Sequence, residues 1–161
     1  MLVTFGATFF GVIASFLLWF GGQWWLKRKR DQRVVKHIAR EIREEIAVNI
    51  DLLAKFAKGV TIMIEEKNLP FFLPYPMNLS VYHYLTSSGE LRLLDVSKQR
   101  HILTAGRLSE RFNKFIDNTE LLLAMLLGKP YFVETSIYRL ERLVEQAQDQ
   151  VKALNEILGK L

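Results

Sequence analysis

The sequence predicts an all-α protein in which an N-terminal transmembrane helix continues into a long helix, followed by an antiparallel three- to four-helix bundle. Three observations predict this fold. Residues 1–26 contain no Asp, Glu, Lys or Arg, later apolar residues recur at helical intervals, and no stretch alternates as a β-strand does. We therefore expect an anchor at 1–26, a basic juxtamembrane collar at 27–36 and a helical bundle domain at 37–161.

The expected anchor is long enough to span a bilayer. At about 1.5 Å per residue, a helix over residues 2–26 measures about 37 Å, against a hydrocarbon core of about 30 Å. The competing interpretation is a signal peptide, in which basic residues precede the apolar run and small residues mark the cleavage site. Here the basic residues follow the run, and Trp and Phe stand where cleavage would occur. An uncleaved anchor is therefore favoured.

Two sets of residues bear on how the anchor packs. Ala7, Gly11 and Ser15 recur at every fourth position, so they share a face that allows a second helix to approach closely in lipid. A chance occurrence of small residues is the alternative. The three tryptophans are expected to form an aromatic belt at the membrane interface.

The net charge of +5 comes from the collar. Residues 27–36 hold six basic side chains and one acid, Asp31, whereas the rest of the chain has 16 basic and 16 acidic residues. So short a cluster is typical of contact with anionic lipid headgroups. It disfavours nucleic acid as a partner, because a nucleic-acid footprint spreads over a whole face of a domain. The residues expected at the membrane interface are Trp19, Trp24, Trp25, Lys27, Arg28, Lys29 and Arg30.

The first helix of the domain is expected over residues 27–67, continuous with the anchor. Its apolar stripe follows an eleven-residue repeat and includes one candidate for a buried polar residue, Asn49, which can fix the register of packing. Residues 68–78 interrupt the pattern, because three prolines exclude a regular helix. This apolar loop either caps the end of the bundle or docks a partner, in which case Phe71, Phe72 and Tyr75 are the candidate contacts.

Three more helices are expected. Asn78 is placed to cap a short helix at 79–85, and residues 86–89 read as a turn. Asp95 is placed to cap a helix over 96–127, which the sequence ends at Gly128.

The last helix, at 131–161, carries four heptads of apolar residues, which predict coiled-coil packing against a helix of this chain or of a second copy. The heptad positions are Val133, Ile137, Leu140, Val144, Ala147, Val151, Leu154, Leu158 and Leu161, of which Leu140, Val144, Val151 and Leu154 are candidate contacts for a partner.

The search for chemistry yields no catalytic, metal-ligating or cofactor-binding set. The absence of cysteine excludes disulfides and thiolate sites. His37 and Glu41 lie one helical turn apart, but a single pair of this kind is more typical of solvated side chains than of a metal site. No phosphate-binding loop, nucleophile elbow or zinc-protease motif is present. We therefore expect a protein that is not an enzyme.

Three stretches resemble a loose group of small uncharacterised single-pass membrane proteins with a cytoplasmic helical domain. They are EIREEIAVNIDLL at 41–53, VYHYLTSSGELRLLD at 81–95 and RFNKFIDNTELL at 111–122. The group combines one span, a long helix with an acidic-and-Asn pattern, and a short aromatic helix followed by a turn. Tyr82 or Tyr84 stands where the group has a Trp. The resemblance implies an architecture and no activity.

The function expected from these features is that of a membrane-anchored helical scaffold or accessory subunit. It would mediate assembly as a homo-oligomer or within a larger membrane protein complex, with anionic lipid at the collar. Because Lys- and Arg-rich flanks stay in the cytoplasm, we expect a single-pass protein of the plasma (inner) membrane, with its N-terminus outside and its C-terminal domain cytoplasmic. The alternatives are a membrane signalling or sensor module and a cofactor-binding helical bundle.

Overall fold

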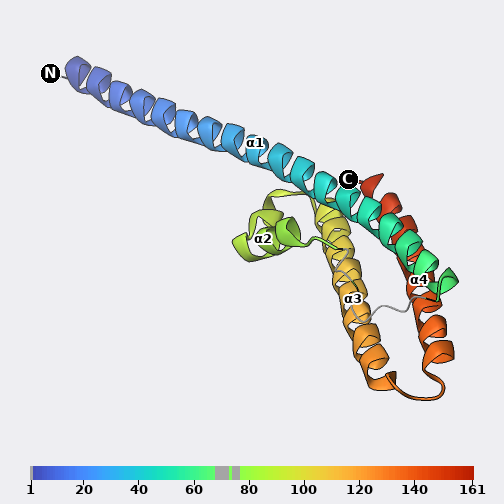
Figure 1. Cartoon of the computed structure of the whole chain (residues 1–161). Helices are drawn as coiled ribbons and strands as arrows, with labels where there is room; N and C mark the ends of the chain where they lie inside the picture. The colour runs from blue at the N-terminus through green and yellow to red at the C-terminus, as the bar shows by residue number, and fades with distance from the viewer. Residues whose placement is uncertain (1, 68–72, 74–76) are drawn as a thin grey trace. The chain divides into compact units, whose positions relative to one another are not determined.

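The computed structural model describes residues 2–67, 73 and 77–161, with side chains from residue 15 onward. Within these residues the chain is all-α, with no strand, which confirms the all-α part of the expected fold. The elements are α1 (Leu2–Glu65), α2 (Ser80–Ser88), the short 3-10 helix η1 (Glu90–Leu93), α3 (Val96–Leu126) and α4 (Phe132–Leu158) (Figure 1). The chain forms two compact units, Met1–Ile38 and Ala39–Leu161.

The first unit is the N-terminal part of α1. Among the described residues, no helix holds an apolar stretch of the length that a membrane crossing requires. The first half of the expected anchor, including Ala7 and Gly11, lies outside the residues whose side chains the structure describes.

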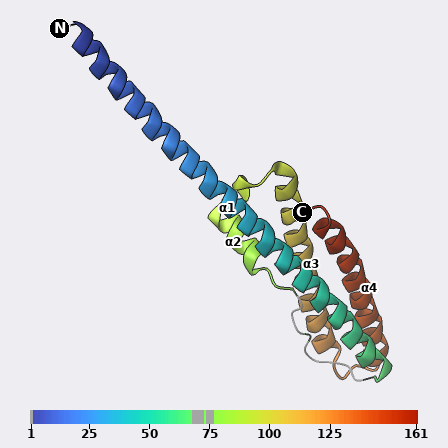
Figure 2. The ribbon, with the colours of Figure 1, turned by 90° about the horizontal axis from the view of Figure 1, so that it is seen from above.

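The second unit is a bundle of the remaining part of α1 with α3 and α4. The two views show α3 and α4 as an antiparallel hairpin, with α1 alongside it (Figures 1 and 2). From residue 39 onward α1 runs in the same direction as α3 and opposite to α4, so the expected antiparallel arrangement holds for α4 against both helices but not between α1 and α3. The reason is that Glu45 and Asn49 hold residues 78–82 beside them, which brings the chain back before α3 begins.

The predicted stripe of α1 is confirmed in the second unit. Its buried members recur at intervals of three and four residues, and they are Ile42, Ile46, Asn49, Leu53, Ala57 and Val60. Asn49 is 3% exposed, so the expected buried polar residue is also confirmed. The Phe56 ring meets the Phe112 ring edge to face, with centroids 5.9 Å apart, a geometry that aromatic pairs favour.

The buried seam of α4 agrees with the predicted one at alternate positions. Leu140, Ala147, Leu154 and Leu161 are buried as expected, but Val144 and Val151 are only half-buried. The other buried positions are Ser136, Leu143 and Ile157. Each of these three precedes a predicted heptad position by one residue, so half of the predicted seam is confirmed and the other half is displaced by one residue.

The buried face of α3 is regular. It keeps a heptad spacing through Ile102, Ala105, Ser109, Phe112, Ile116, Thr119 and Leu123. Ser109 and Thr119 satisfy their hydroxyls by donating to the carbonyl oxygens of Ala105 and Phe115, at 3.0 and 2.8 Å. Both polar side chains are therefore accommodated in the core through hydrogen bonds within their own helix.

The helix ends follow the predicted signals, with one exception. The Asp95 carboxylate accepts from the Lys98 amide at 2.9 Å, as expected of an N-cap, and Gly128 follows α3 with a φ of +77°. The expected turn at 86–89 is wrong for residues 86–88, which extend α2. Thr86 and Ser87 donate their hydroxyls to carbonyls within α2, and the helix ends at Gly89, whose φ is +74°.

Candidate functional site

The collar carries paired aromatic and basic side chains on consecutive turns. The Arg28 guanidinium carbon lies 5.2 Å from the centroid of the Trp24 ring, and the Lys29 ammonium nitrogen lies 4.3 Å from that of Trp25. Both pairs are four residues apart, and both distances fall within the range of cation–π attraction. Trp19 and Ser15, the remaining described members of the expected interface and small face, are also exposed.

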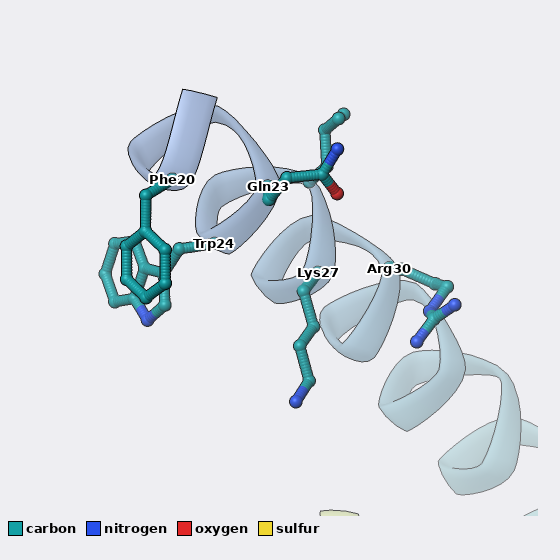
Figure 3. Close-up of a pocket in the computed structure, with 6 residues that line it drawn as sticks. Phe20, Gln23, Trp24, Lys27 and Arg30 are labelled. Carbon is teal, nitrogen blue, oxygen red and sulfur yellow. The ribbon is translucent and has the colours of Figure 1, made fainter. Parts of the chain in front are cut away.

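A shallow hollow of about 500 Å³ lies where the end of the expected anchor meets the collar (Figure 3). The Phe20 and Trp24 rings lie together at one end of the segment, and the Lys27 and Arg30 side chains extend from the turns that follow. The full lining is Phe20, Gln23, Trp24, Leu26, Lys27 and Arg30. The hollow is therefore half aromatic and apolar, and half made of hydrogen-bond donors.

In the second unit, Glu45 of α1 forms one part of a polar clamp on α2. Its carboxylate is nearly buried, at 7% exposed, yet it is satisfied. It accepts from the backbone amides of Val81 at 2.6 Å and Tyr82 at 3.1 Å, and from the Ser80 hydroxyl at 3.3 Å. These amides belong to the first turn of α2, where they have no partner within the helix. Glu45 thus caps α2 from another helix, and the positive end of the helix dipole favours its charge.

Asn49, one turn further along α1, forms the second part of the clamp. Its amide nitrogen donates to the Asn78 carbonyl at 2.7 Å, and its amide oxygen accepts from the Asn78 backbone amide at 2.6 Å. Asn78 in turn accepts from the Ser80 amide at 3.0 Å with its side chain. The N-cap position of α2 is Leu79 rather than the expected Asn78, but the Asn78 side chain still satisfies the first amide of the helix, while Glu45 takes the next two.

Two side chains of α3 reach the same stretch of chain from the other side. The Asn113 amide donates to the Met77 carbonyl at 3.4 Å, and the Glu120 carboxylate accepts from the Leu73 backbone amide. The Leu73 and Met77 side chains are buried. The described part of the stretch before α2 is thus held through its backbone by residues of α1 and α3. Phe71, Phe72 and Tyr75 lie outside the described residues.

Tyr82 locks α2 against α3. Its ring lies over Gly106, where an added Cβ would overlap the ring carbons. Burial raises the pKa of the Tyr82 hydroxyl, and the Glu110 carboxylate adds to this, whereas Arg107 lowers it. Gly106 therefore leaves the space that the Tyr82 ring occupies. The sequence pattern of apolar residues does not predict this role of Gly106.

The outer face of α2 is exposed and polar. Tyr84 donates its hydroxyl to the Glu90 carboxylate at 3.1 Å, and this hydrogen bond raises the pKa of Tyr84. Among the described residues no three His, Asp or Glu side chains gather where a metal ion could bind. Because backbone amides and a hydroxyl already occupy the Glu45 carboxylate, the clamp acts as a positioning device for α2.

The turn end of the α3–α4 hairpin exposes large apolar side chains. Met125 is 62% exposed and Leu121 is 56% exposed, although both belong to the long apolar run that ends α3. The hairpin end, as we call this surface, consists of Leu121, Met125, Leu127, Tyr131 and Val133. All five lie within two helical turns of the connection between α3 and α4, so the hairpin end is a candidate contact surface.

The candidate partner contacts on α4 differ in how exposed they are. Leu140 and Leu154 are buried within the second unit, whereas Val144 and Val151 are half-buried. Val151 borders a groove of about 470 Å³ between α1 and α4, together with Ala54, Ala57, Lys58, Thr61, Gln148 and Lys152. Of the predicted set on α4, Val144 and Val151 thus retain accessible surface.

Comparisons of the chain with protein-family models, with curated proteins and with solved structures find no match.

Proposed function

We propose that the chain is a non-enzymatic, membrane-anchored helical scaffold or accessory subunit, which assembles with itself or with a larger membrane complex. The observation that carries the proposal is the segregation of charge. Residues 1–26 have no charged side chain, and the next ten residues hold the whole net charge of +5. The exposed indoles of Trp24 and Trp25, each paired with a cation, suit the interface between lipid and water.

The hairpin end supports an assembly role. Its exposed apolar side chains lie on the second unit, whereas the collar belongs to the first unit. A chain with an apolar segment for the bilayer and a separate apolar surface on its bundle has two means of contact. The distribution of Lys and Arg favours a single pass through the plasma (inner) membrane, with the N-terminus outside and the C-terminal domain in the cytoplasm.

Membrane anchoring is tested by alkaline washing of isolated membranes. The wild-type chain should stay with the membranes, and Val12→Arg should be released, because an arginine at the centre of a span costs roughly 3 kcal/mol. Gln32→Arg is the matched control, since it adds the same charge to the collar and should leave retention unchanged. Release of the wild-type chain would refute the anchoring. Digestion of the C-terminal domain by a protease added to intact cells would refute the orientation.

Assembly is tested by cross-linking, for which the absence of cysteine makes every introduced cysteine a unique reporter. Gly11→Cys reports on the small face and Met125→Cys on the hairpin end, while Lys152→Cys, on an exposed part of α4, is the control. We expect cross-linking in native membranes at Gly11 or Met125 and none at Lys152. A dimer-sized product indicates self-assembly, and a different mass indicates another subunit. Absence of any product at all three positions would argue against assembly.

A further inference from the structure

The cations of the collar are divided between two faces. Arg28 and Lys29 are turned back over the rings of Trp24 and Trp25. Lys27 and Arg30 make no such contact, and within the described residues no ion pair joins them to a carboxylate, although Asp31 is adjacent. Arg28 and Lys29 are therefore engaged by the preceding indoles, whereas Lys27 and Arg30 are available to a ligand.

The available cations line up with an amide donor. Gln23, Lys27 and Arg30 are spaced by four and three residues, so they form one stripe, and all three are exposed. Along the helix axis the stripe covers about 10 Å. The headgroup region on each side of a bilayer is roughly 5–7 Å deep. The stripe therefore has the length needed to reach from the edge of the hydrocarbon through the headgroups.

The chemistry of the stripe suits a phosphate. Arginine offers a fork of donors that fits phosphate oxygens, lysine acts as a compact charge, and the Gln23 amide adds a neutral donor. Lys27 and Arg30 differ by about 4.5 Å in height along the helix, close enough for both to reach one phosphate group. Phe20, Trp24 and Leu26 line the same hollow and give an apolar wall for the chain below that phosphate.

We infer that this face of the collar is a binding site for an anionic phospholipid. Gln23, Lys27 and Arg30 hold the headgroup phosphate, and Phe20, Trp24 and Leu26 pack against the start of the acyl chains. The inference rests on the proposed membrane anchoring, and it adds that lipid recognition belongs to one face of the collar, whereas a diffuse positive charge would act equally from all sides.

The test uses the tryptophans as reporters. The full-length chain is reconstituted into phosphatidylcholine vesicles that contain either brominated phosphatidylglycerol or brominated phosphatidylcholine, and the quenching of Trp fluorescence is compared. The ratio of the two gives the preference for the anionic lipid. We expect a preference of several-fold for the wild-type chain. Lys27→Gln combined with Arg30→Gln should abolish it, because each of the two cations contributes a factor of about five to the binding of the anionic lipid.

The matched control removes the same charge from the other face. Arg28→Gln combined with Lys29→Gln should retain most of the preference. Equal losses in the two double variants would overturn the inference in favour of diffuse attraction, and so would a wild-type chain without preference. Displacement of the brominated lipid by inorganic phosphate, at an ionic strength matched with chloride, would assign the site to free phosphate and also overturn it.

Retention of the wild-type chain in vesicles of phosphatidylcholine alone, after an alkaline wash, separates this inference from the proposed function. A chain that is released contradicts the anchoring itself. A chain that is retained but shows no lipid preference contradicts only the assigned site.

Discussion

Removing the Glu45 carboxylate should destabilise the second unit far more than its position beside exposed residues suggests. The carboxylate accepts from two backbone amides and one hydroxyl of α2. A hydrogen bond to a charged acceptor contributes about 1.5–3 kcal/mol, and a buried donor without a partner costs about 1–3 kcal/mol. Water can enter the space left by Glu45→Ala and form hydrogen bonds to the freed amides, which recovers part of the lost free energy. We expect a net loss of about 3 kcal/mol, a large share of the 5–15 kcal/mol typical of a folded domain.

The assay combines unfolding with local protection. The full-length chain in a mild non-ionic detergent is titrated with urea and followed by circular dichroism, and hydrogen exchange is measured for residues 77–88. Glu45→Ala should lower the free energy of unfolding and speed exchange at Val81 and Tyr82. Glu45→Gln keeps one acceptor oxygen and loses the charge, so its loss should be smaller, about 1–2 kcal/mol.

Glu44→Ala is the control, because the two glutamates are neighbours with opposite surroundings. The Glu44 side chain is 66% exposed, and its pair with Arg40 spans 3.8 Å. Such surface pairs contribute little, so its removal should cost less than about 0.5 kcal/mol. If Glu45→Ala were no more destabilising than Glu44→Ala, with unchanged exchange at Val81 and Tyr82, the clamp would not hold α2 and the reasoning would be refuted.

Three further predictions concern the packing of the second unit. Gly106→Ala should destabilise the fold by about 1–3 kcal/mol, because the added methyl group overlaps the Tyr82 ring. Gly59→Ala is the control: its methyl group meets nothing within 4 Å, so it should stabilise α1 by about 0.5–1 kcal/mol. Urea unfolding measures both changes, and a Gly106→Ala variant as stable as the wild type would contradict the close contact. Leu140→Ala should cost about 2–5 kcal/mol and Val144→Ala clearly less, since Leu140 lies in the seam and Val144 beside it; equal costs would restore the seam predicted from the heptads. The raised pKa of Tyr82 makes the fold favour the neutral hydroxyl, so its contribution is complete below the usual value of 10.0 and is lost as the pH rises through the folded pKa; Tyr82→Phe should therefore show a smaller loss of stability above pH 10 than the wild type, and parallel pH profiles would contradict this.

The sequence predicts those parts of the fold that depend on large apolar residues and on local signals. The stripe of α1 has Ile42 and Leu53 where the spacing puts them, and Asp95 caps α3 as its position before a helix suggests. Each of these depends on interactions within one helix or on burial alone. A single-sequence pattern contains that information, because the periodicity of apolar residues directly reflects which face is buried.

The α4 seam could be predicted only in part. Leu140 and Leu154 are buried as the heptads predict, whereas Leu143 is buried in place of Val144. Leu143 and Val144 are both apolar, so the spacing along α4 alone does not decide which of them is buried. That choice depends on the helices packed against α4, which the sequence pattern of α4 does not identify.

The residues of the candidate site also differ in whether the sequence alone could identify them. The aromatic and basic residues of the collar are evident from composition, since they stand within ten residues of one another. Glu45 is not, because a carboxylate on a helix is expected in water, where its charge is solvated. Its burial depends on backbone amides that lie 36 and 37 residues further along the chain. The one available sign is that Glu45 lies one turn before Asn49, which is itself on the predicted apolar stripe.

The clamp recognises backbone, and this determines what α2 is free to do. Glu45 and Asn49 contact amides and a carbonyl of residues 78–82, together with one serine hydroxyl, so most side chains of α2 take no part in holding it. Tyr82 is the main exception, because it faces Gly106. The outer face, with Tyr84, can therefore change without loss of the position of α2. A scaffold whose surface must suit a particular partner benefits from such an arrangement, in which the long helix fixes where α2 lies and leaves its exposed residues to specify the contact.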